Sequence, residues 1–176
     1  RAAHHGAIIA RLPASAAMMA PEGNAPARGW FETRPRLTPT AREDDWDILL
    51  GDGPVVATAI HDGHAIRPSL RPLLALGPDE RLREEDPLTG LFTDVGDVRI
   101  RVPTSRFEVD LNRPRDGAVY ARPEDCWGLQ LWSSPLPERE IERSLQRWDR
   151  FYGMVADLLD RLLERWDAVL LIDLHS

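Results

Sequence analysis

Residues 54–64, PVVATAIHDGH, decide the fold of this chain. The first seven form a continuous apolar run of strand length with β-branched residues, which predicts a buried strand. His61 follows where that strand ends, and Asp62 and Gly63 form a turn dipeptide whose glycine accepts positive φ values. Because His64 comes directly after the turn, the two imidazoles can converge on one point.

This histidine pair has a functional and an ordinary interpretation. Neutral imidazole is a good zinc ligand, so convergence across a tight turn suits a metal ion. Histidines in a glycine turn can equally be solvated loop residues, because short motifs are unspecific. The far end of the chain favours the metal, since residues 168–174, AVLLIDL, predict a second buried strand and His175 follows it directly. Ligands bind at the carboxyl edge of strands in open α/β sheets, and both strands deliver a histidine there.

Composition restricts the class of protein. A length of 176 residues suits one domain, and a net charge of −7 argues against nucleic-acid binding, which needs a basic face. The single cysteine, Cys126, is expected to be a small buried side chain; it cannot form an internal disulfide, which favours a reducing, cytoplasmic compartment. No apolar run is long enough to cross a membrane. The oligomeric state is left open.

Segment patterns predict a flexible beginning and one α/β domain. Residues 1–29 are dominated by alanine, proline and glycine and are expected to be flexible, whereas 30–176 are expected to form the domain. Apolar residues at helical spacing predict a long helix between 135 and 166, and a helix leading into strand 168–174 favours parallel strands. A short exposed helix is expected over 78–85.

Two further segments alternate between polar and apolar residues. Residues 97–102 and 106–113 each predict a half-buried strand. In the second segment Phe107, Val109 and Leu111 share the apolar face. The polar face carries Arg106, Glu108, Asp110 and Asn112.

Three motifs give the chain a resemblance to a known family. HDGH at 61–64, SRFEVDLNRP at 105–114 and DLHS at 173–176 resemble the N-formylglutamate amidohydrolases, which are related in fold to zinc carboxypeptidases and aspartoacylase. The resemblance covers roughly 54–176. It implies an α/β fold with a mixed, largely parallel sheet flanked by helices, of phosphorylase/hydrolase-like zinc carboxypeptidase architecture and incomplete at the C-terminus. Residues 30–176 would be the N-terminal part of a single amidohydrolase domain.

The resemblance implies one zinc ion held by three histidines. His61 and His175 match the two histidine ligands of the wider group, and His64 falls where that group has glutamate. Asp173 is expected to orient a ligand from outside the first coordination sphere, with capping of a loop at the strand end as the alternative.

The resemblance also implies residues that bind substrate. Asn112 and Arg113 match a pair that grips a substrate carboxylate, and Arg106 matches a catalytic arginine that polarises the scissile carbonyl or binds a second carboxylate. Guanidinium groups bind carboxylates in a bidentate manner, which suits an N-acyl amino diacid. Asp110 either supports Arg106 or Arg113 or forms a surface ion pair.

Two departures from the family pattern lead to further expectations. The family usually has Pro-His-Ser-Gly at the first motif, where this chain has Ile60-His61-Asp62-Gly63. The glutamate that acts as general base in the family follows the last motif, so we expect the chain to be incomplete there and inactive by itself. Glu108 is the nearest alternative base by position.

The leading functional prediction is a zinc-dependent amidohydrolase. It would cleave the formyl or another small acyl group from an acidic amino acid such as N-formyl-L-glutamate, and its partner would be that small molecule. Zinc lowers the pKa of bound water toward 7 and polarises a carbonyl. The alternatives are a zinc peptidase or deacylase acting on another N-acyl amino acid, and a non-catalytic α/β domain.

Overall fold

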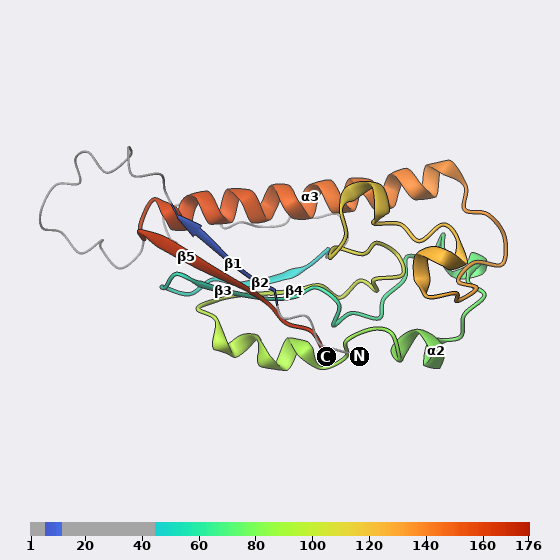
Figure 1. The fold of residues 1–176 in the computed structure, drawn as a ribbon, viewed down its shortest axis with the longest axis horizontal. Coiled ribbons are helices and arrows are strands. Elements are labelled where there is room, and N and C mark those ends of the chain that lie inside the picture. Colours follow the sequence, from blue (N-terminus) through green and yellow to red (C-terminus); the bar gives the residue numbers. More distant parts are fainter. Residues whose placement is uncertain (1–5, 12–44) are drawn as a thin grey trace, which may run out of the picture.

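The computed structural model describes residues 6–11 and 45–176 and shows an α/β fold (Figure 1). Its sheet has five strands in the order β1-β5-β3-β4-β2. The strands are β1 (Gly6–Arg11), β2 (Asp47–Leu49), β3 (Val55–Ala59), β4 (Val98–Arg101) and β5 (Ala168–Asp173). The α-helices are α2 (Pro78–Leu82) and α3 (Glu138–Leu163), and the 3-10 helices are η2 (Arg71–Leu73), η3 (Thr89–Val95), η4 (Arg115–Gly117) and η5 (Pro123–Cys126).

The centre of the sheet is parallel and its edges are antiparallel. Strand β3 pairs in parallel with β4 on one side and with β5 on the other. Strands β2 and β1 add antiparallel edges to β4 and β5, respectively. The expected mixed, largely parallel sheet flanked by helices is therefore confirmed. The carboxyl ends of three neighbouring strands meet at one edge, where polar side chains can converge.

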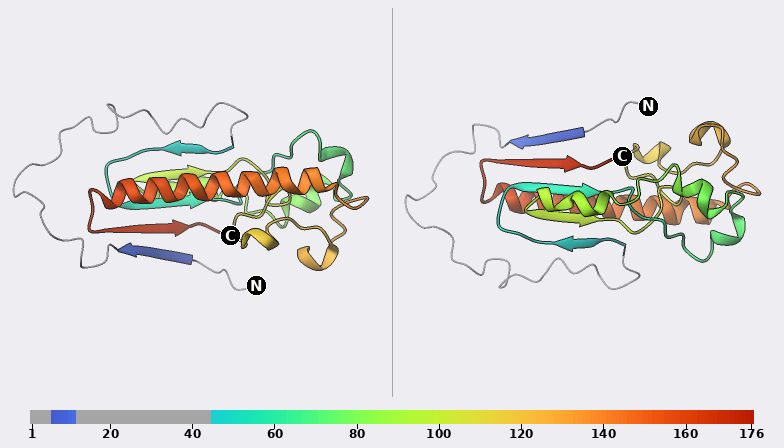
Figure 2. Two further views of the ribbon diagram at one scale, coloured as in Figure 1. Left: turned by 90° about the horizontal axis from the view of Figure 1, so that it is seen from above. Right: turned by 90° about the horizontal axis from the view of Figure 1, so that it is seen from below.

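Helices cover both faces of this sheet. Helix α3 lies along one face and η3 lies against the other (Figures 1 and 2). The core-facing side of α3 buries four apolar residues at helical spacing: Phe151, Val155, Leu158 and Leu162. They pack with strand residues in one core cluster that includes Val56, Ile100 and Val169. Burial of this apolar stripe holds the helix on the sheet.

Most predicted elements are present with slightly different ends. The predicted strands at 54–60, 97–102 and 168–174 correspond to β3, β4 and β5, and the long helix is the continuous α3. The short strand β2 was not predicted. The predicted limit between a flexible segment and the domain, at residues 29 and 30, lies outside the described residues, whereas Gly6–Arg11 within that segment forms β1.

The predicted strand over 106–113 is wrong, because this segment forms consecutive turns. Glu108 N donates to Ser105 O at 2.9 Å, and Asn112 N donates to the Asp110 carboxylate at 2.8 Å. Alternation usually separates a buried face from a solvated one. Here Glu108 and Asp110 are as buried as Phe107, since both carboxylates have internal partners.

Two smaller expectations concern the cysteine and membranes. Cys126 is buried and free, as expected. Within residues 6–11 and 45–176, no helix has the length and apolar character needed to cross a membrane.

Candidate metal centre and substrate site

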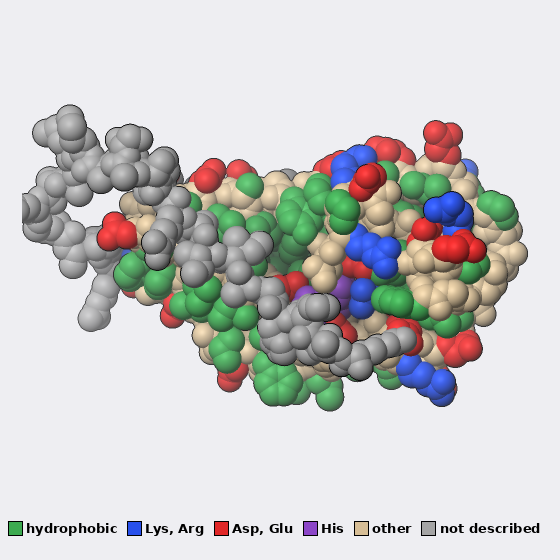
Figure 3. Space-filling view, in the orientation of Figure 1, with side chains coloured by type: hydrophobic (Ala, Val, Ile, Leu, Met, Phe, Trp, Pro, Cys, Tyr) green, Lys and Arg blue, Asp and Glu red, His purple; other side chains and the backbone are tan. Residues whose placement is uncertain are grey.

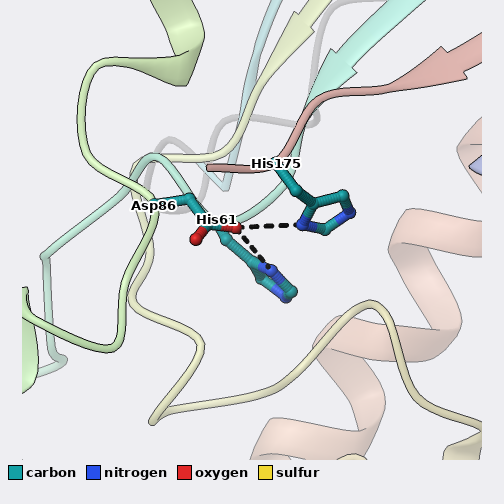
Figure 4. Close-up of side chains that lie close together, drawn as sticks. All are labelled: His61, Asp86 and His175. Carbon is teal, nitrogen blue, oxygen red and sulfur yellow. Dashed lines mark hydrogen bonds and ion pairs between the residues drawn. The ribbon is translucent and has the colours of Figure 1, made fainter. Parts of the chain in front are cut away.

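Two histidines and an aspartate converge at the carboxyl edge of the central strands (Figure 4). His61 follows β3, His175 follows β5, and Asp86 comes from the loop between α2 and η3. One ligand atom from each residue lies within 4.8 Å of the other two, and these three residues are hereafter called the His/Asp/His cluster. Histidine side chains reach the surface beside arginine and acidic side chains (Figure 3).

The Asp86 carboxylate is the meeting point of the cluster. His175 Nδ1 lies 2.9 Å from Asp86 Oδ2, and His61 Nδ1 lies 3.5 Å from the same oxygen. The two imidazole rings have centroids 5.0 Å apart. Both rings thus turn the same kind of nitrogen, Nδ1, toward one point.

The other ring nitrogen of each imidazole, Nε2, forms a hydrogen bond with a second carboxylate. His61 Nε2 lies 2.7 Å from Asp110 Oδ1, and His175 Nε2 lies 2.8 Å from Asp173 Oδ2. Thr58 Oγ1 donates to Asp173 Oδ1 at 2.6 Å, which fixes that carboxylate in turn. Metal-bound histidines commonly give their other ring N–H to a carboxylate, which sets the tautomer and the ring orientation.

The cluster has the donor set and geometry that suit a divalent ion. Two imidazole nitrogens and one carboxylate oxygen form a common set of protein ligands for catalytic zinc. His61 Nδ1 is buried, and no residue in the described part of the chain is its hydrogen-bond partner. A buried polar atom without a partner is costly, and an ion bound between the three residues would satisfy it.

Charge coupling within the cluster changes two pKa values. Hydrogen bonds to Asp173 and Asp86 raise the pKa of His175 to about 9. Burial acts to raise the pKa of Asp86, but a hydrogen bond with His175 and the proximity of the His61 imidazole hold it well below its usual range. His175 thus lies between two carboxylates, Asp173 and Asp86, and both favour its protonated form.

His64 lies outside the cluster, with different partners. Its Nδ1 makes a short contact with the Glu85 carboxylate, and its Nε2 lies 3.0 Å from Arg81 Nη2. Ser105 Oγ also donates to Glu85. The structure thus brings together two of the three histidines predicted as ligands and places Asp86 beside them instead of His64.

The turn at Gly63 explains how His61 and His64 diverge. A side chain on Gly63 would place its Cβ 2.1 Å from the carbonyl carbon of Pro103, so only glycine fits beside this backbone. Ala65 N then donates to Pro103 O at 3.0 Å. The chain is therefore pressed against the segment after β4, and His64 is directed toward α2.

Asp110 connects the His/Asp/His cluster to Arg106. Arg106 Nη2 donates to Asp110 Oδ2 at 2.9 Å, and Tyr120 Oη donates to the same oxygen through a short hydrogen bond. Burial opposes ionisation of Asp110, but hydrogen bonding to His61 and the charge of Arg106 keep its pKa well below the usual range. Asp110 is completely buried and contacts both His61 and Arg106.

Arg113 and Asn112 lie next to this buried group and are more accessible. The Arg113 guanidinium carbon lies 4.6 Å from the centroid of the Tyr120 ring, and its side chain is 33% exposed. Asn112 is exposed and lines a cavity of about 340 Å³ together with Asp173. Both side chains are open to a ligand in a way that Asp110 is not.

Glu108, named above as an alternative base, belongs to a separate buried network. It accepts hydrogen bonds from the backbone N–H of Arg67 at 2.7 Å and from Arg147 Nη1 at 2.7 Å. Arg147 Nη2 also forms an ion pair with Asp45. These contacts anchor the turns at 105–113 to α3.

Comparison with known proteins identifies the family of this chain. The family model of N-formylglutamate amidohydrolase matches residues 53–176, which contain every member of the His/Asp/His cluster. The chain belongs to the N-formylglutamate amidohydrolase family. No curated protein sequence matches the chain.

A solved structure supports the fold of this family member. The chain is similar to the crystal structure of N-formylglutamate amidohydrolase from Ralstonia eutropha JMP134, with a TM-score of 0.57 and 16% sequence identity. The match covers 69% of this chain and 53% of that chain. This N-formylglutamate amidohydrolase family member thus spans about half the length of the matched structure.

Sequence reasoning missed three residues of this family member's site. Asp86 lies in an acidic run that ends the short helix region, and no spacing relates it to His61 or His175. Thr58 lies within the apolar run that predicts a buried strand, and nothing in that pattern indicates that its hydroxyl contacts Asp173. Tyr120 lies beyond the resembling motif, and its burial between Arg106 and Arg113 depends on the turns that sequence alternation did not predict.

Proposed function

We propose that this chain carries the metal centre and substrate-binding arginines of a zinc-dependent hydrolase of N-formyl-L-glutamate, or of another acidic amino acid with a small N-acyl group. The observation that carries the proposal is the link from the His/Asp/His cluster through Asp110 to Arg106, in a member of the N-formylglutamate amidohydrolase family.

The proposed ligands are His61, His175 and Asp86, which takes the place given to His64 by the sequence. A bound zinc ion would act as a Lewis acid on a carbonyl and lower the pKa of water. Asp110 and Asp173 hold the two imidazoles so that their Nδ1 atoms face the ion position. Such outer carboxylates fix ligand orientation and raise ligand basicity.

Cationic residues beside the cluster suit an acidic substrate. Arg113 and Asn112 are accessible and are proposed to bind one substrate carboxylate. Arg106 is proposed to bind the second carboxylate or the carbonyl oxygen of the scissile amide. Paired arginines favour a dianion because charge-assisted hydrogen bonds are roughly twice as strong as neutral ones.

In the proposed reaction, water adds to the formyl carbon and the C–N bond breaks. The oxygen of water stays on that carbon, which leaves as formate, and the two protons of water end on the amine nitrogen, which leaves as the ammonium group of glutamate. Glu108 has no part in this proposal, because both of its neighbours Arg67 and Arg147 bind its carboxylate away from the cluster.

Formate release tests the proposal directly. The purified protein is loaded with zinc and supplied with N-formyl-L-glutamate, and formate is measured enzymatically before and after chelation. Zinc-dependent turnover that is lost in His61→Ala and retained in the exposed control Asp149→Asn would support the proposal, and it would overturn the expectation that the chain is inactive by itself. Hydrolysis of N-acetyl substrates or of N-formyl derivatives of neutral amino acids at equal rates would point to the broader deacylase. Absence of turnover with zinc demonstrably bound would leave a non-catalytic binding domain.

A further inference from the structure

Trp127 has an unusual backbone conformation for a large side chain. Its φ and ψ are 57° and 25°, the left-handed region, directly after η5, and Gly128 follows with φ of 83°. A bulky residue with positive φ is rare, because its Cβ lies too close to the following carbonyl oxygen. Trp127 is 47% exposed, so burial in the core does not account for it.

This conformation directs the indole onto the substrate-site arginine. The guanidinium carbon of Arg106 lies 5.0 Å from the centroid of the Trp127 ring. Tyr120 meets the same indole edge-to-face, with centroids 5.9 Å apart. An arginine stacked on an aromatic face is attracted to it and is held in one plane, because the guanidinium is planar and weakly hydrated.

Asp110 connects the stacked Arg106 guanidinium to the His/Asp/His cluster. Arg106 contacts Asp110, and Asp110 contacts the ring of His61. The Arg106 side chain is only 13% exposed, so the indole forms part of what separates this cation from water. Arg106 Nε is buried, and within the described residues it has no hydrogen-bond partner, so internal contacts do not use all donors of the cation.

We propose that Trp127 is a positioning residue for Arg106, and that its indole fixes the guanidinium plane and shields it from water so that Arg106 binds a carboxylate tightly. The inference rests on the proposed function, in which Arg106 contacts the substrate. Shielding strengthens an ion pair, because charges interact more strongly where water is excluded. The cost of the left-handed backbone is then offset by tighter substrate binding.

The test compares variants that separate the ring from the backbone. Trp127→Gly removes the indole and accepts the left-handed conformation without strain, whereas Trp127→Phe keeps an aromatic ring. Trp166→Phe is the matched control, because Trp166 lies against Arg165 with its ring centroid 6.0 Å from the guanidinium carbon, away from the cluster. Circular dichroism and thermal unfolding establish that each variant is folded.

Binding of glutarate, a dicarboxylate without a scissile bond, is measured by calorimetry on the zinc-loaded protein. Trp127→Gly is expected to weaken binding by about 2- to 30-fold, the range of a cation–π contact. Trp127→Phe is expected to stay within about threefold of wild type, and Trp166→Phe is expected to leave the affinity unchanged. In an Arg106→Gln background, Trp127→Gly should have no further effect, which a merely structural role would not produce.

Several outcomes separate this inference from the proposed function. Glutarate binding that depends on Trp127, without turnover of N-formyl-L-glutamate, would remove the enzyme function and keep the role of Trp127. Equal affinity of wild type and Trp127→Gly would overturn the role of Trp127 even if the enzyme is active. The same loss in the Arg106→Gln background, or no glutarate binding by folded wild type, would also overturn it.

Discussion

At the scale of single residues, Asp110 joins three groups of the candidate site. It accepts hydrogen bonds from His61, Arg106 and Tyr120 while completely buried. Asp110→Asn keeps the shape but removes the charge, and we expect it to lower zinc affinity by about 10- to 100-fold, the usual effect of losing an outer carboxylate. Competition with a fluorescent chelator measures this affinity. Asp149→Asn, which breaks an exposed ion pair with Arg115, is the control and should bind zinc as wild type does.

Arg113 provides a second test at this scale. Replacing Arg113 with alanine should weaken binding of N-formyl-L-glutamate by about 1.5–3 kcal/mol, the value of a charge-assisted hydrogen bond. A neutral diamide analogue should lose little, and Arg115→Ala nearby should leave both ligands unaffected. Equal losses for the acidic and the neutral ligand would exclude a carboxylate-binding role for Arg113.

At the scale of elements, the turn after β3 positions His61. Gly63→Ala would bring a Cβ into backbone atoms of Pro103, and we expect it to lower the free energy of unfolding by about 1–3 kcal/mol, as overpacking does. Gly153→Ala is the matched control, because among the described residues, apart from the neighbouring backbone of α3 itself, no atom lies within 4 Å of a Cβ at this exposed position. That change should stabilise the protein by about 0.5–1 kcal/mol, since alanine is the better helix former. Urea unfolding of both variants measures the contrast.

The N-terminal turn of α3 gives the protein a specific response to acid. Burial acts to raise the pKa of Glu140, but hydrogen bonds from Ser69 and Arg67 keep it below its ordinary value. A lowered pKa stabilises the fold fully above the unfolded value, about 4.3, and the stabilisation disappears as pH falls through the folded value. Glu140→Gln should therefore be less stable than wild type at pH 6 and should approach it near pH 3. A constant difference between the two proteins across this range would contradict the assignment.

Sequence patterns predicted the parts of the site that lie on regular elements. His61 and His175 follow apolar strands, and parallel pairing of β3 with β5 brings both to one edge. Asp86 was not predictable in this way, because it reaches the cluster through a loop whose path depends on tertiary contacts, such as its backbone N–H donating to His61 O at 3.0 Å. The alternating segment 106–113 forms turns instead of a strand for a related reason: its polar side chains Glu108 and Asp110 have buried partners, so the alternation does not separate a buried face from a solvated one.

At the scale of the whole molecule, metal binding should stabilise the fold. An ion that binds only the folded chain adds about 2.7 kcal/mol when present at 100 times its dissociation constant. Zinc should therefore raise the unfolding temperature, and a chelator should reverse the effect. The increase should be lost in Asp86→Asn and His175→Ala and kept in His64→Ala, because His64 lies outside the cluster. Dependence on His64 without dependence on Asp86 would restore the ligand set predicted from the sequence.

The pairing of β3 with β5 also has a kinetic consequence. Val55 lies opposite Leu170, so most of the described chain forms a loop between the two strands. Closing so long a loop costs entropy before any contact compensates for it, and such contacts tend to form late in folding. His175 can join His61 only after this closure, so an ion cannot act as an early nucleus. In stopped-flow refolding, we expect the helical circular dichroism signal, which comes mainly from α3, to appear before zinc is bound. Zinc binding should then report the pairing of β3 with β5, the last step of folding.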